Sequence, residues 1–280
     1  MTPPPSPILS AHGAKIPALG FGTSPMTGGL APDTVVAALK AGYRHIDTAW
    51  KYGSEQGVGA GIKASGVPRE EIFLVTKVSH ENLRAADFAR SVDESLRNLQ
   101  VDYVDLLHIH WPTIDKIPLA ETVGALVKAK RDGLTRHIGV ANFNIALVEE
   151  TMRLSPEPLA TLQAEYHPYL DQARVLEFCK RAGIVFTAYC PLGRGRLFKD
   201  PVIAEIARAK GRTIAQVALR WQIQQGNIAP IPRSANPAHM AESLAVFDFT
   251  LTDEEMRRIH ALARPDGRIA NPAGRAPAWD

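Results

Sequence analysis

Short runs of apolar and β-branched residues recur along the chain, and most of them end in a polar residue. Eight such runs predict strands, and most lie roughly 22 to 33 residues apart, which fits the length of one strand–helix unit. The regular spacing therefore predicts a repeated βα organisation. The runs end near Thr23, Asp47, Lys77, His110, Asn142, Gln163, Tyr189 and Ser234.

The segments between these runs carry apolar residues three or four positions apart, the spacing that places them on one face of a helix. Asp33 is expected to cap a helix that stops at Gly42. The patterns Thr213-x-x-Gln216 and Thr252-x-x-Glu255 predict capping boxes at two helix starts. The expected apolar faces are Phe88, Val92, Leu96 and Leu99; Val123, Leu126 and Val127; Ile145, Val148 and Met152; and Ile214, Val217, Ala218 and Trp221.

Eight βα alternations predict an α/β protein with a closed (β/α)8 TIM barrel, and we expect residues 1–280 to form one domain. Residues 7–19 predict an N-terminal β-hairpin lid with its turn at His12-Gly13. The C-terminal tail is expected to lie over the active-site face. A doubly wound dinucleotide-binding sheet is the other fold considered, but Gly20-Phe-Gly22-Thr-Ser-Pro25 has proline where its fingerprint needs the last glycine.

The composition mainly excludes other classes of protein. The 280 residues are 45% hydrophobic and 22% charged, with a formal net charge of +3. Neither a basic block nor an apolar run of about 20 residues is present, so we expect no nucleic-acid partner and no membrane span. The start of the chain lacks the features of a signal peptide, which favours a cytoplasmic location. Nothing in the sequence indicates a strong oligomer interface, so we expect a monomer. Cys179 and Cys190 form no C-x-x-C motif and are interpreted as buried thiols.

The polar residues at the strand ends are the most informative feature. In a closed barrel the carboxyl ends of the strands converge on the face where such enzymes keep their active sites. Asp47, Lys77 and His110 end three consecutive runs, and an ionisable group there is costly to bury without a partner. We therefore expect these side chains to share one site.

Tyr52 follows the second run closely and completes a set of four. A phenol has an ordinary pKa of about 10, and a nearby ammonium is expected to lower it. Asp47 would hold Lys77 charged, and His110 would orient a carbonyl oxygen. Such a site donates a proton to an oxygen that gains negative charge, as in carbonyl reduction. The hydride must come from a nicotinamide or flavin cofactor.

With these residues in view, the sequence resembles the aldo-keto reductase family over about residues 7–265. It looks most like a branch of small bacterial members that reduce 2,5-diketo-D-gluconate and methylglyoxal. The matching segments, in chain order, are Gly20-Phe-Gly-Thr23, Gly42-Tyr-Arg-His-Ile-Asp47, Tyr52-Gly-Ser-Glu55, Thr76-Lys77, Asp102-Tyr-Val-Asp-Leu106, Ile109-His110-Trp-Pro112, Gly139-Val-Ala-Asn142-Phe, Gln163-x-Glu-Tyr-His-Pro-Tyr169, Tyr189-Cys-Pro-Leu-Gly193 and Ile231-Pro-Arg-Ser234.

The resemblance implies a catalytic set of Asp47, Tyr52, Lys77 and His110, with Tyr52 as the general acid. It implies an NADPH cofactor, with NADH left open as a second one, and small aldehydes, α-dicarbonyls or keto-sugar acids as substrates. Trp50 and Trp111 would line the substrate pocket, and no metal is implied. The implied cofactor contacts are Gly22, Thr23, Asp47, Asn142, Gln163, Tyr189, Pro191, Leu192, Gly193, Arg233, Ser234, His239, Glu242 and Ser243.

The sequence departs from the family where the adenosine phosphate would bind. The family's P-K-S carries Arg233 here, and the later arginine and asparagine are His239 and Ser243, while Glu242 remains. A guanidinium can grip a phosphate through two hydrogen bonds, so we still expect NADPH to be preferred over NADH.

Two other functions remain open at this point. His108 and His110 lie two positions apart and would face the same way on a strand, as ligands of a metal-dependent hydrolase would. The simpler interpretation of His108 is a packed side chain one layer below the site. The second alternative is a non-catalytic NADPH-binding regulatory subunit. Substrate choice is expected to depend on residues 112–119, 191–200 and 264–280.

Overall fold

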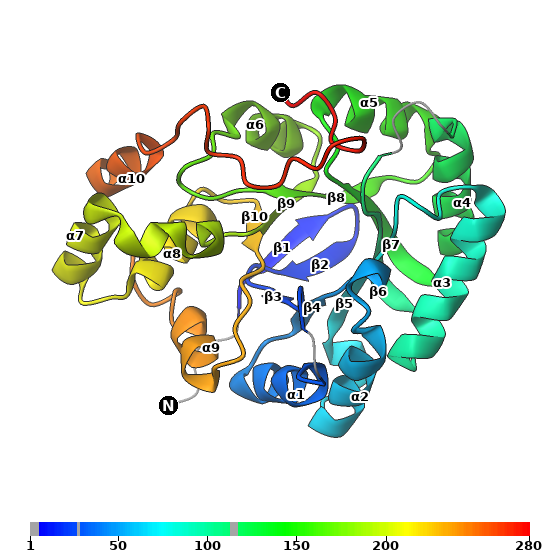
Figure 1. Cartoon of the computed structure of the whole chain (residues 1–280), viewed down its shortest axis with the longest axis horizontal. Coiled ribbons are helices and arrows are strands. Elements are labelled where there is room, and N and C mark those ends of the chain that lie inside the picture. The colour runs from blue at the N-terminus through cyan, green and yellow to red at the C-terminus, as the bar shows by residue number, and fades with distance from the viewer. Residues whose placement is uncertain (1–5, 27–28, 113–116) are drawn as a thin grey trace.

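The computed structural model describes residues 6–26, 29–112 and 117–280. Eight parallel strands pair with one another in chain order (Figure 1). Gly20 N donates to Pro230 O at 3.0 Å and Gly22 N donates to Pro232 O at 2.9 Å, so the first and last strands also meet. The predicted (β/α)8 barrel is therefore confirmed. The strands are β3 (Phe21–Gly22), β4 (His45–Asp47), β5 (Phe73–Val78), β6 (Val104–Ile109), β7 (Thr135–Ala141), β8 (Leu159–Glu165), β9 (Val185–Tyr189) and β10 (Ile228–Pro230).

Helices surround the sheet in the order expected of βα units (Figure 1). The predicted capping boxes at Thr213 and Thr252 both form. The α-helices are α1 (Ala31–Ala41), α2 (Glu55–Ser65), α3 (Ala85–Leu99), α4 (Leu119–Arg131), α5 (Ile145–Leu154), α6 (Ala173–Arg181), α7 (Pro201–Lys210), α8 (Ile214–Gln224), α9 (Pro237–Leu244) and α10 (Asp253–His260); the 3-10 turns are η1 (Trp50–Tyr52), η2 (Arg69–Glu71) and η3 (Gly193–Lys199).

Three details differ from the sequence-based expectations. Helix α1 begins at Ala31, before the expected cap Asp33, which lies in its first turn; Leu30 takes the N-cap position without a side-chain hydrogen bond, and Pro32 is tolerated in the first turn. Met152 is 40% exposed and does not share the buried face of Val148. Strand β10 stops at Pro230, before Ser234, because Pro232 cannot donate a backbone hydrogen bond.

The N-terminal hairpin consists of β1 (Ile8–Ala11) and β2 (Ala14–Pro17) and confirms the expected turn. Its buried Ala11, Ala14 and Ile16 pack in one cluster with residues at the amino ends of the strands, including Phe73 and Val185. The hairpin therefore closes the end of the barrel opposite to the polar strand ends.

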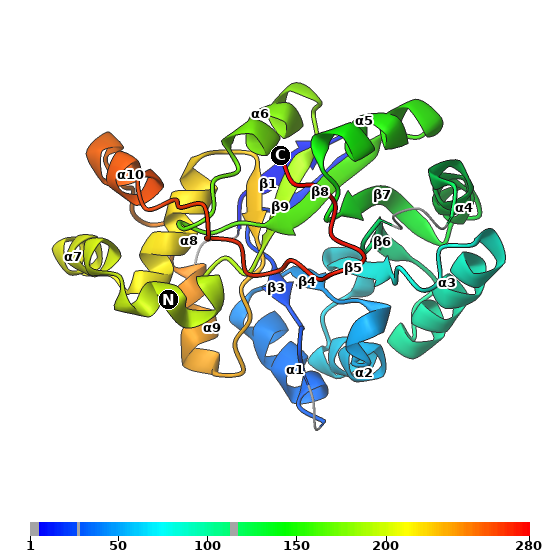
Figure 2. The same cartoon turned by 45° about the horizontal axis from the view of Figure 1, so that its top comes forward.

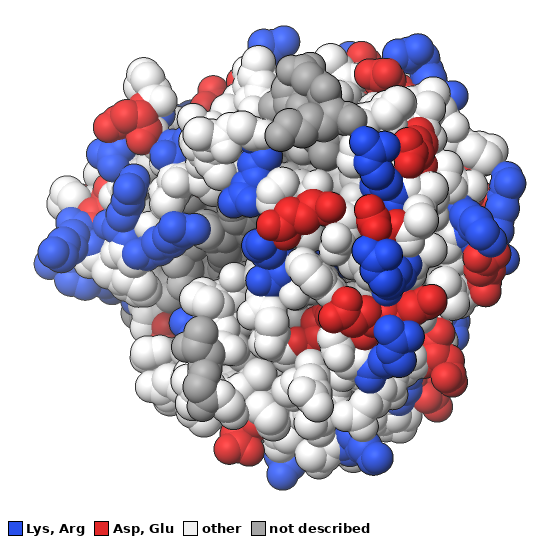
Figure 3. All heavy atoms as spheres, turned by 45° about the vertical axis from the view of Figure 1, so that its right-hand side comes forward, with Lys and Arg blue, Asp and Glu red and all other residues white. Residues whose placement is uncertain are grey.

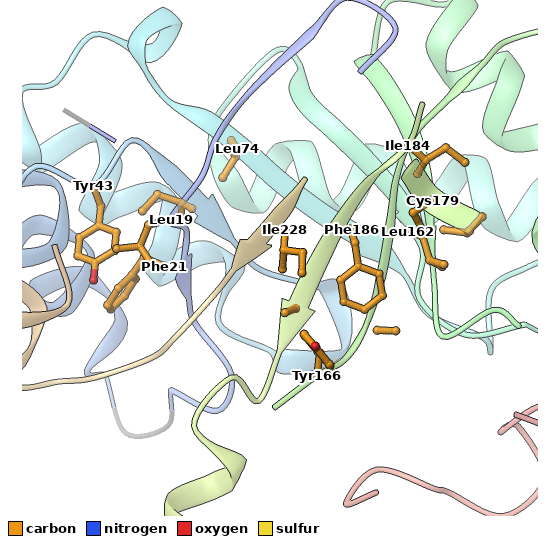
Figure 4. Close-up of a cluster of buried hydrophobic side chains, with 14 of the residues drawn as sticks. Leu19, Phe21, Tyr43, Leu74, Leu162, Tyr166, Cys179, Ile184, Phe186 and Ile228 are labelled. Carbon is orange, nitrogen blue, oxygen red and sulfur yellow. The ribbon is translucent and has the colours of Figure 1, made fainter. Parts of the chain in front are cut away.

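A larger apolar core lies between the sheet and the helices. Figure 4 shows Tyr166 and Phe186 side by side in it, with ring centroids 5.9 Å apart. Cys179 is fully buried there, as expected, whereas Cys190 is partly exposed. Both faces of these strands are buried, and this explains why the predicted strand segments are continuously apolar in the sequence.

The C-terminal tail runs from α10 across the barrel to an end near α5 (Figures 1 and 2). Ile269 N and Ala270 N each donate at 2.6 Å to the carboxylate of Glu165, the last residue of β8. Asn144 Nδ2, at the start of α5, donates at 2.8 Å to Ala278 O. The tail thus covers the carboxyl ends of the strands. In the described part of the chain, no helix is long and apolar enough to cross a membrane.

Candidate active site

A cavity of about 940 Å³ opens at the carboxyl ends of the strands, under the tail. Figure 3 shows a hollow on one face of the molecule, with Lys and Arg side chains on either side of it. Most of the residues expected to bind cofactor or substrate line the cavity together: Gly22, Thr23, Asp47, Tyr52, His110, Trp111, Asn142, Gln163, Tyr189, Pro191, Leu192, Arg233, Ser234, His239, Glu242 and Ser243.

Asp47 and Lys77 form a buried ion pair below this cavity. Lys77 Nζ donates at 2.6 Å to Asp47 Oδ1 and at 2.8 Å to Thr48 O. The other carboxylate oxygen of Asp47 accepts a hydrogen bond from Gln163 Nε2 at 2.8 Å. Burial alone would lower the pKa of Lys77, but Asp47 and Tyr52 leave it raised above 10.5. The ammonium is therefore held charged in a place closed to water.

Tyr52 lies at the end of η1 between this ion pair and His110. Its ring lies 5.6 Å from that of His110 in an edge-to-face arrangement, and Lys77 Nζ is 5.4 Å from the ring centroid. Burial, the largest influence, raises the pKa of Tyr52 above 10.0, and Lys77, the second, lowers it. The expectation of a net lowered pKa was wrong, because the surroundings of the phenol disfavour its charged form more than Lys77 favours it.

His110 is the residue after β6 and faces the same cavity. Burial first, and then the charge of Lys77, hold its pKa well below 6.5. The imidazole is therefore neutral at pH 7 and can donate a hydrogen bond from one nitrogen while accepting at the other.

His108 lies deeper in the barrel and confirms the simpler interpretation. It is fully buried, and its Nε2 lies 2.5 Å from Thr161 Oγ1. The contact explains Gly139 on the neighbouring strand, because a Cβ there would lie 2.4 Å from Thr161 Oγ1 and 2.8 Å from the His108 ring. Among the described residues, no three His, Cys, Asp or Glu side chains are grouped to hold a metal ion, so the hydrolase ligand set does not assemble.

Asn142, just after β7, and Gln163 and Tyr189, on β8 and β9, form a polar wall of the cavity. Tyr189 donates from its hydroxyl to Asn142 Oδ1 at 2.8 Å, and Asn142 Nδ2 donates to His110 O at 2.8 Å. Asn142 adopts a left-handed backbone conformation with φ of 64°, which turns the chain out of β7. Each amide nitrogen carries a second N–H that can bind a ligand.

The far end of the cavity carries the residues expected near the adenosine phosphate. Arg233 Nη2 donates to Pro25 O at 2.7 Å, Ser234 Oγ lies 3.5 Å from His239 Nδ1, and Glu242 accepts from Thr213 Oγ1 at 2.5 Å. Glu242 is therefore already engaged by the protein, whereas Arg233 is a cation on an exposed rim.

Three expected residues lie outside the cavity lining. Lys77 and Gly193 are buried outside the lining, and Trp50, at the start of η1, is partly exposed and does not take part in it. Of the expected substrate loops, residues 113–116 lie outside the described part. Sequence reasoning missed Ser24, which hydrogen-bonds to Tyr52, and His80, although both lie just after strands and the strand-end rule would have found them.

Proteins similar to this chain are reductases, as the arrangement of the site suggests. The family described as "Aldo/keto reductase family" matches residues 18–264. Methylglyoxal reductase DkgB of Salmonella typhimurium is 42% identical over 95% of this chain and 99% of its own. Glyoxal reductase of Bacillus subtilis is 40% identical over 93% and 94%. A solved structure assigned as a 2,5-diketo-D-gluconic acid reductase B has a TM-score of 0.96 and 49% identity, with 98% of both chains covered.

The chain therefore belongs to the aldo-keto reductase family. It is an NAD(P)H-dependent oxidoreductase, and the family's activity is carbonyl reduction.

Proposed function

We propose that this protein is an NADPH-dependent reductase of small aldehydes, α-dicarbonyls and keto-sugar acids, with Tyr52 as the proton donor. One observation carries the proposal. The same cavity presents the hydroxyl of Tyr52 and the imidazole of His110 at one end, and Arg233 with Ser234 at the other. A proton donor and a phosphate-binding end in one cavity suit a nicotinamide nucleotide together with a carbonyl substrate.

The relatives support the substrate classes. Two of them are named methylglyoxal reductase and glyoxal reductase, and the similar structure is assigned to 2,5-diketo-D-gluconic acid. Methylglyoxal and 2,5-diketo-D-gluconate are therefore the substrates to test first. The cavity of about 940 Å³ has room for a cofactor beside either of them.

The side chains present fit the cofactor. Asn142 and Gln163 offer amide N–H groups where a carboxamide would need partners, and Tyr189 supplies an aromatic ring beside them. Arg233 and Ser234 offer a guanidinium and a hydroxyl for a phosphate. When bound, the cofactor supplies the hydride that no side chain can provide.

The residues of the chain supply the rest of the reaction. Neutral His110 donates a hydrogen bond to the substrate oxygen and turns it toward Tyr52. As the carbonyl carbon is reduced, negative charge grows on this oxygen, and the buried charge of Lys77 stabilises it through Tyr52. The phenol then transfers its proton to this oxygen, which completes the alcohol product and leaves Tyr52 as a phenolate beside Lys77; a proton from solvent restores the phenol after the product leaves.

The direct test follows the absorbance of NADPH and NADH with methylglyoxal and with 2,5-diketo-D-gluconate, each with and without a chelator. Chelator-insensitive oxidation, faster with NADPH, is expected. Arg233→Met should raise the KM for NADPH at least tenfold and leave that for NADH within about twofold, because only NADPH carries the extra phosphate. Equal effects on both cofactors would contradict the role of Arg233.

The same assay separates the alternative of a regulatory subunit. Tight NADPH binding without turnover of any carbonyl would favour that function and overturn the proposed one. The cytoplasmic location and the monomeric state expected from the sequence remain predictions.

A further inference from the structure

Arg275 is a tail residue whose guanidinium faces the substrate end of the cavity. It lines the cavity together with Tyr52, His110 and Trp111. Its guanidinium carbon lies 5.6 Å from the centroid of the Trp111 ring, and its Nη1 lies 3.3 Å from His80 Nε2. The charge is thus placed on the same wall as the proton donor.

No carboxylate neutralises this guanidinium within the described part of the chain. Arg275 takes part in none of the ion pairs formed there, and its Nε is buried without a hydrogen-bond partner among the described residues. Among the other cations that line the cavity, Lys51 is occupied by both carboxylate oxygens of Glu81 at 2.8 Å, Arg194 interacts with Cys190, and Arg233 lies at the phosphate end. Arg275 is partly exposed, but its Nε is closed to water, and a buried donor without an acceptor is costly, so an anion bound here would supply the missing acceptor.

Hydrogen bonds to the barrel anchor the tail both before and after Arg275 and so fix its position. Before it, Ile269 N and Ala270 N are fixed to Glu165 at 2.6 Å each. After it, Asn144 Nδ2 binds Ala278 O at 2.8 Å. Trp279 packs edge-to-face on Trp111 with ring centroids 6.2 Å apart. A group fixed in this way loses little freedom when it binds a ligand.

We propose that Arg275 binds a carboxylate of the substrate, so that the enzyme selects aldehydes and ketones that carry a carboxylate a short distance from the carbonyl group. This inference rests on the proposed function and narrows its substrate class. The carbonyl oxygen lies between Tyr52 and His110, and the carboxylate accepts hydrogen bonds from the guanidinium beside Trp111.

Two further observations agree with this placement. The charge of Arg275 is close enough to His110 to contribute to the lowering of its pKa, after burial and Lys77. The partner of Arg275 in the described structure is His80, whose pKa is lowered first by burial and then by Arg275, so its imidazole is neutral at pH 7 and can be exchanged for a carboxylate without loss of an ion pair.

The test compares matched pairs of substrates that differ only in charge: 4-carboxybenzaldehyde with 4-carbamoylbenzaldehyde, and succinic semialdehyde with its amide. The wild-type enzyme is expected to show a lower KM for the acid of at least one pair. Arg275→Gln should raise that KM about tenfold, with kcat little changed and the KM of the amide within about twofold. Arg275→Lys should restore part of the difference.

Arg153→Gln is the matched control, because it removes the same charge from an exposed residue of α5 that lies outside the expected substrate loops and does not line the cavity. An acid-to-amide KM ratio that stays the same in Arg275→Gln, or changes equally in Arg153→Gln, would overturn the proposal.

A binding measurement separates this proposal from the proposed function. Calorimetry with benzoate and benzamide, in the presence of NADPH, requires no turnover. Benzoate binding that is lost in Arg275→Gln supports the carboxylate site even if no carbonyl is reduced. Methylglyoxal reduction without any preference for benzoate or for the acids would support the reductase and overturn the carboxylate site.

Discussion

Lys77 donates to Asp47 over 2.6 Å at a place where the lysine side chain is fully buried and the aspartate side chain is 2% exposed. The pair joins the ends of neighbouring strands, because Asp47 stands beside Val75 in the β4–β5 register and Lys77 lies two residues further along. Lys77 Nζ lies 5.4 Å from the centroid of the Tyr52 ring, so the charge of the pair acts directly on the proposed proton donor.

Lys77→Met should destabilise the fold as well as abolish reduction. The change leaves the Asp47 carboxylate buried without its cation, which costs about 3–5 kcal/mol of the free energy of unfolding. Chemical denaturation measures this value. Lys51→Met removes the nearly half-exposed Lys51–Glu81 pair and should cost at most about 1 kcal/mol. Equal losses in the two variants would contradict the buried pair's special role.

The pH dependence of reduction follows from the shifted pKa values of His110 and Tyr52. His110 has a pKa well below 6.5, so it stays neutral at pH 7 and above. Tyr52 has a raised pKa, and a proton donor works only below its pKa, so the loss of activity moves to alkaline pH. We expect kcat/KM for methylglyoxal to be flat between about pH 6 and 9 and to fall above that range. A midpoint between pH 6.5 and 8 would disagree with this assignment.

Glu165→Gln should release the tail. The Glu165 carboxylate accepts from Ile269 N, Ala270 N and His167 Nε2, and an amide can replace only part of this set. Hydrogen exchange at residues 269 and 270 should become at least tenfold faster. Glu177→Gln, on the exposed side of α6, is the control and should leave both amides protected.

The contact between the Glu165 carboxylate and the tail should weaken only at acid pH. Burial, the largest influence, would raise the pKa of Glu165, but the hydrogen bonds from His167 and the tail leave it lowered. A lowered pKa means that the stabilisation is complete above the ordinary carboxyl pKa of about 4.3 and is lost as pH falls through the folded value. Tail protection that falls between pH 8 and 6 would not fit this carboxylate.

The barrel could be predicted from the sequence because its signals are local. The strand runs are apolar on both faces, and the capping boxes at Thr213 and Thr252 need only residues three positions apart. Converging strand ends follow from the fold, so placing Asp47 and Lys77 together required only the βα rhythm.

Features that depend on packing escaped the sequence. The pKa of Tyr52 depends on how fully protein surrounds the phenol, and spacing does not show this. Met152 has the spacing of a buried residue, yet its side chain is 40% exposed. The Nε of Arg275 has no partner among the described residues, and this depends on which side chains meet the tail, as His80 does across a sequence separation of 195 residues.

Single-turnover reduction by Tyr52→Phe tests whether Tyr52 supplies the proton. Pre-bound NADPH is mixed with methylglyoxal, and NADPH binding is measured separately by calorimetry. The variant should bind NADPH within about twofold of the wild type, because the phenol is placed against the substrate, and should reduce methylglyoxal at least 100-fold more slowly. An unchanged rate in Tyr52→Phe would show that another group supplies the proton.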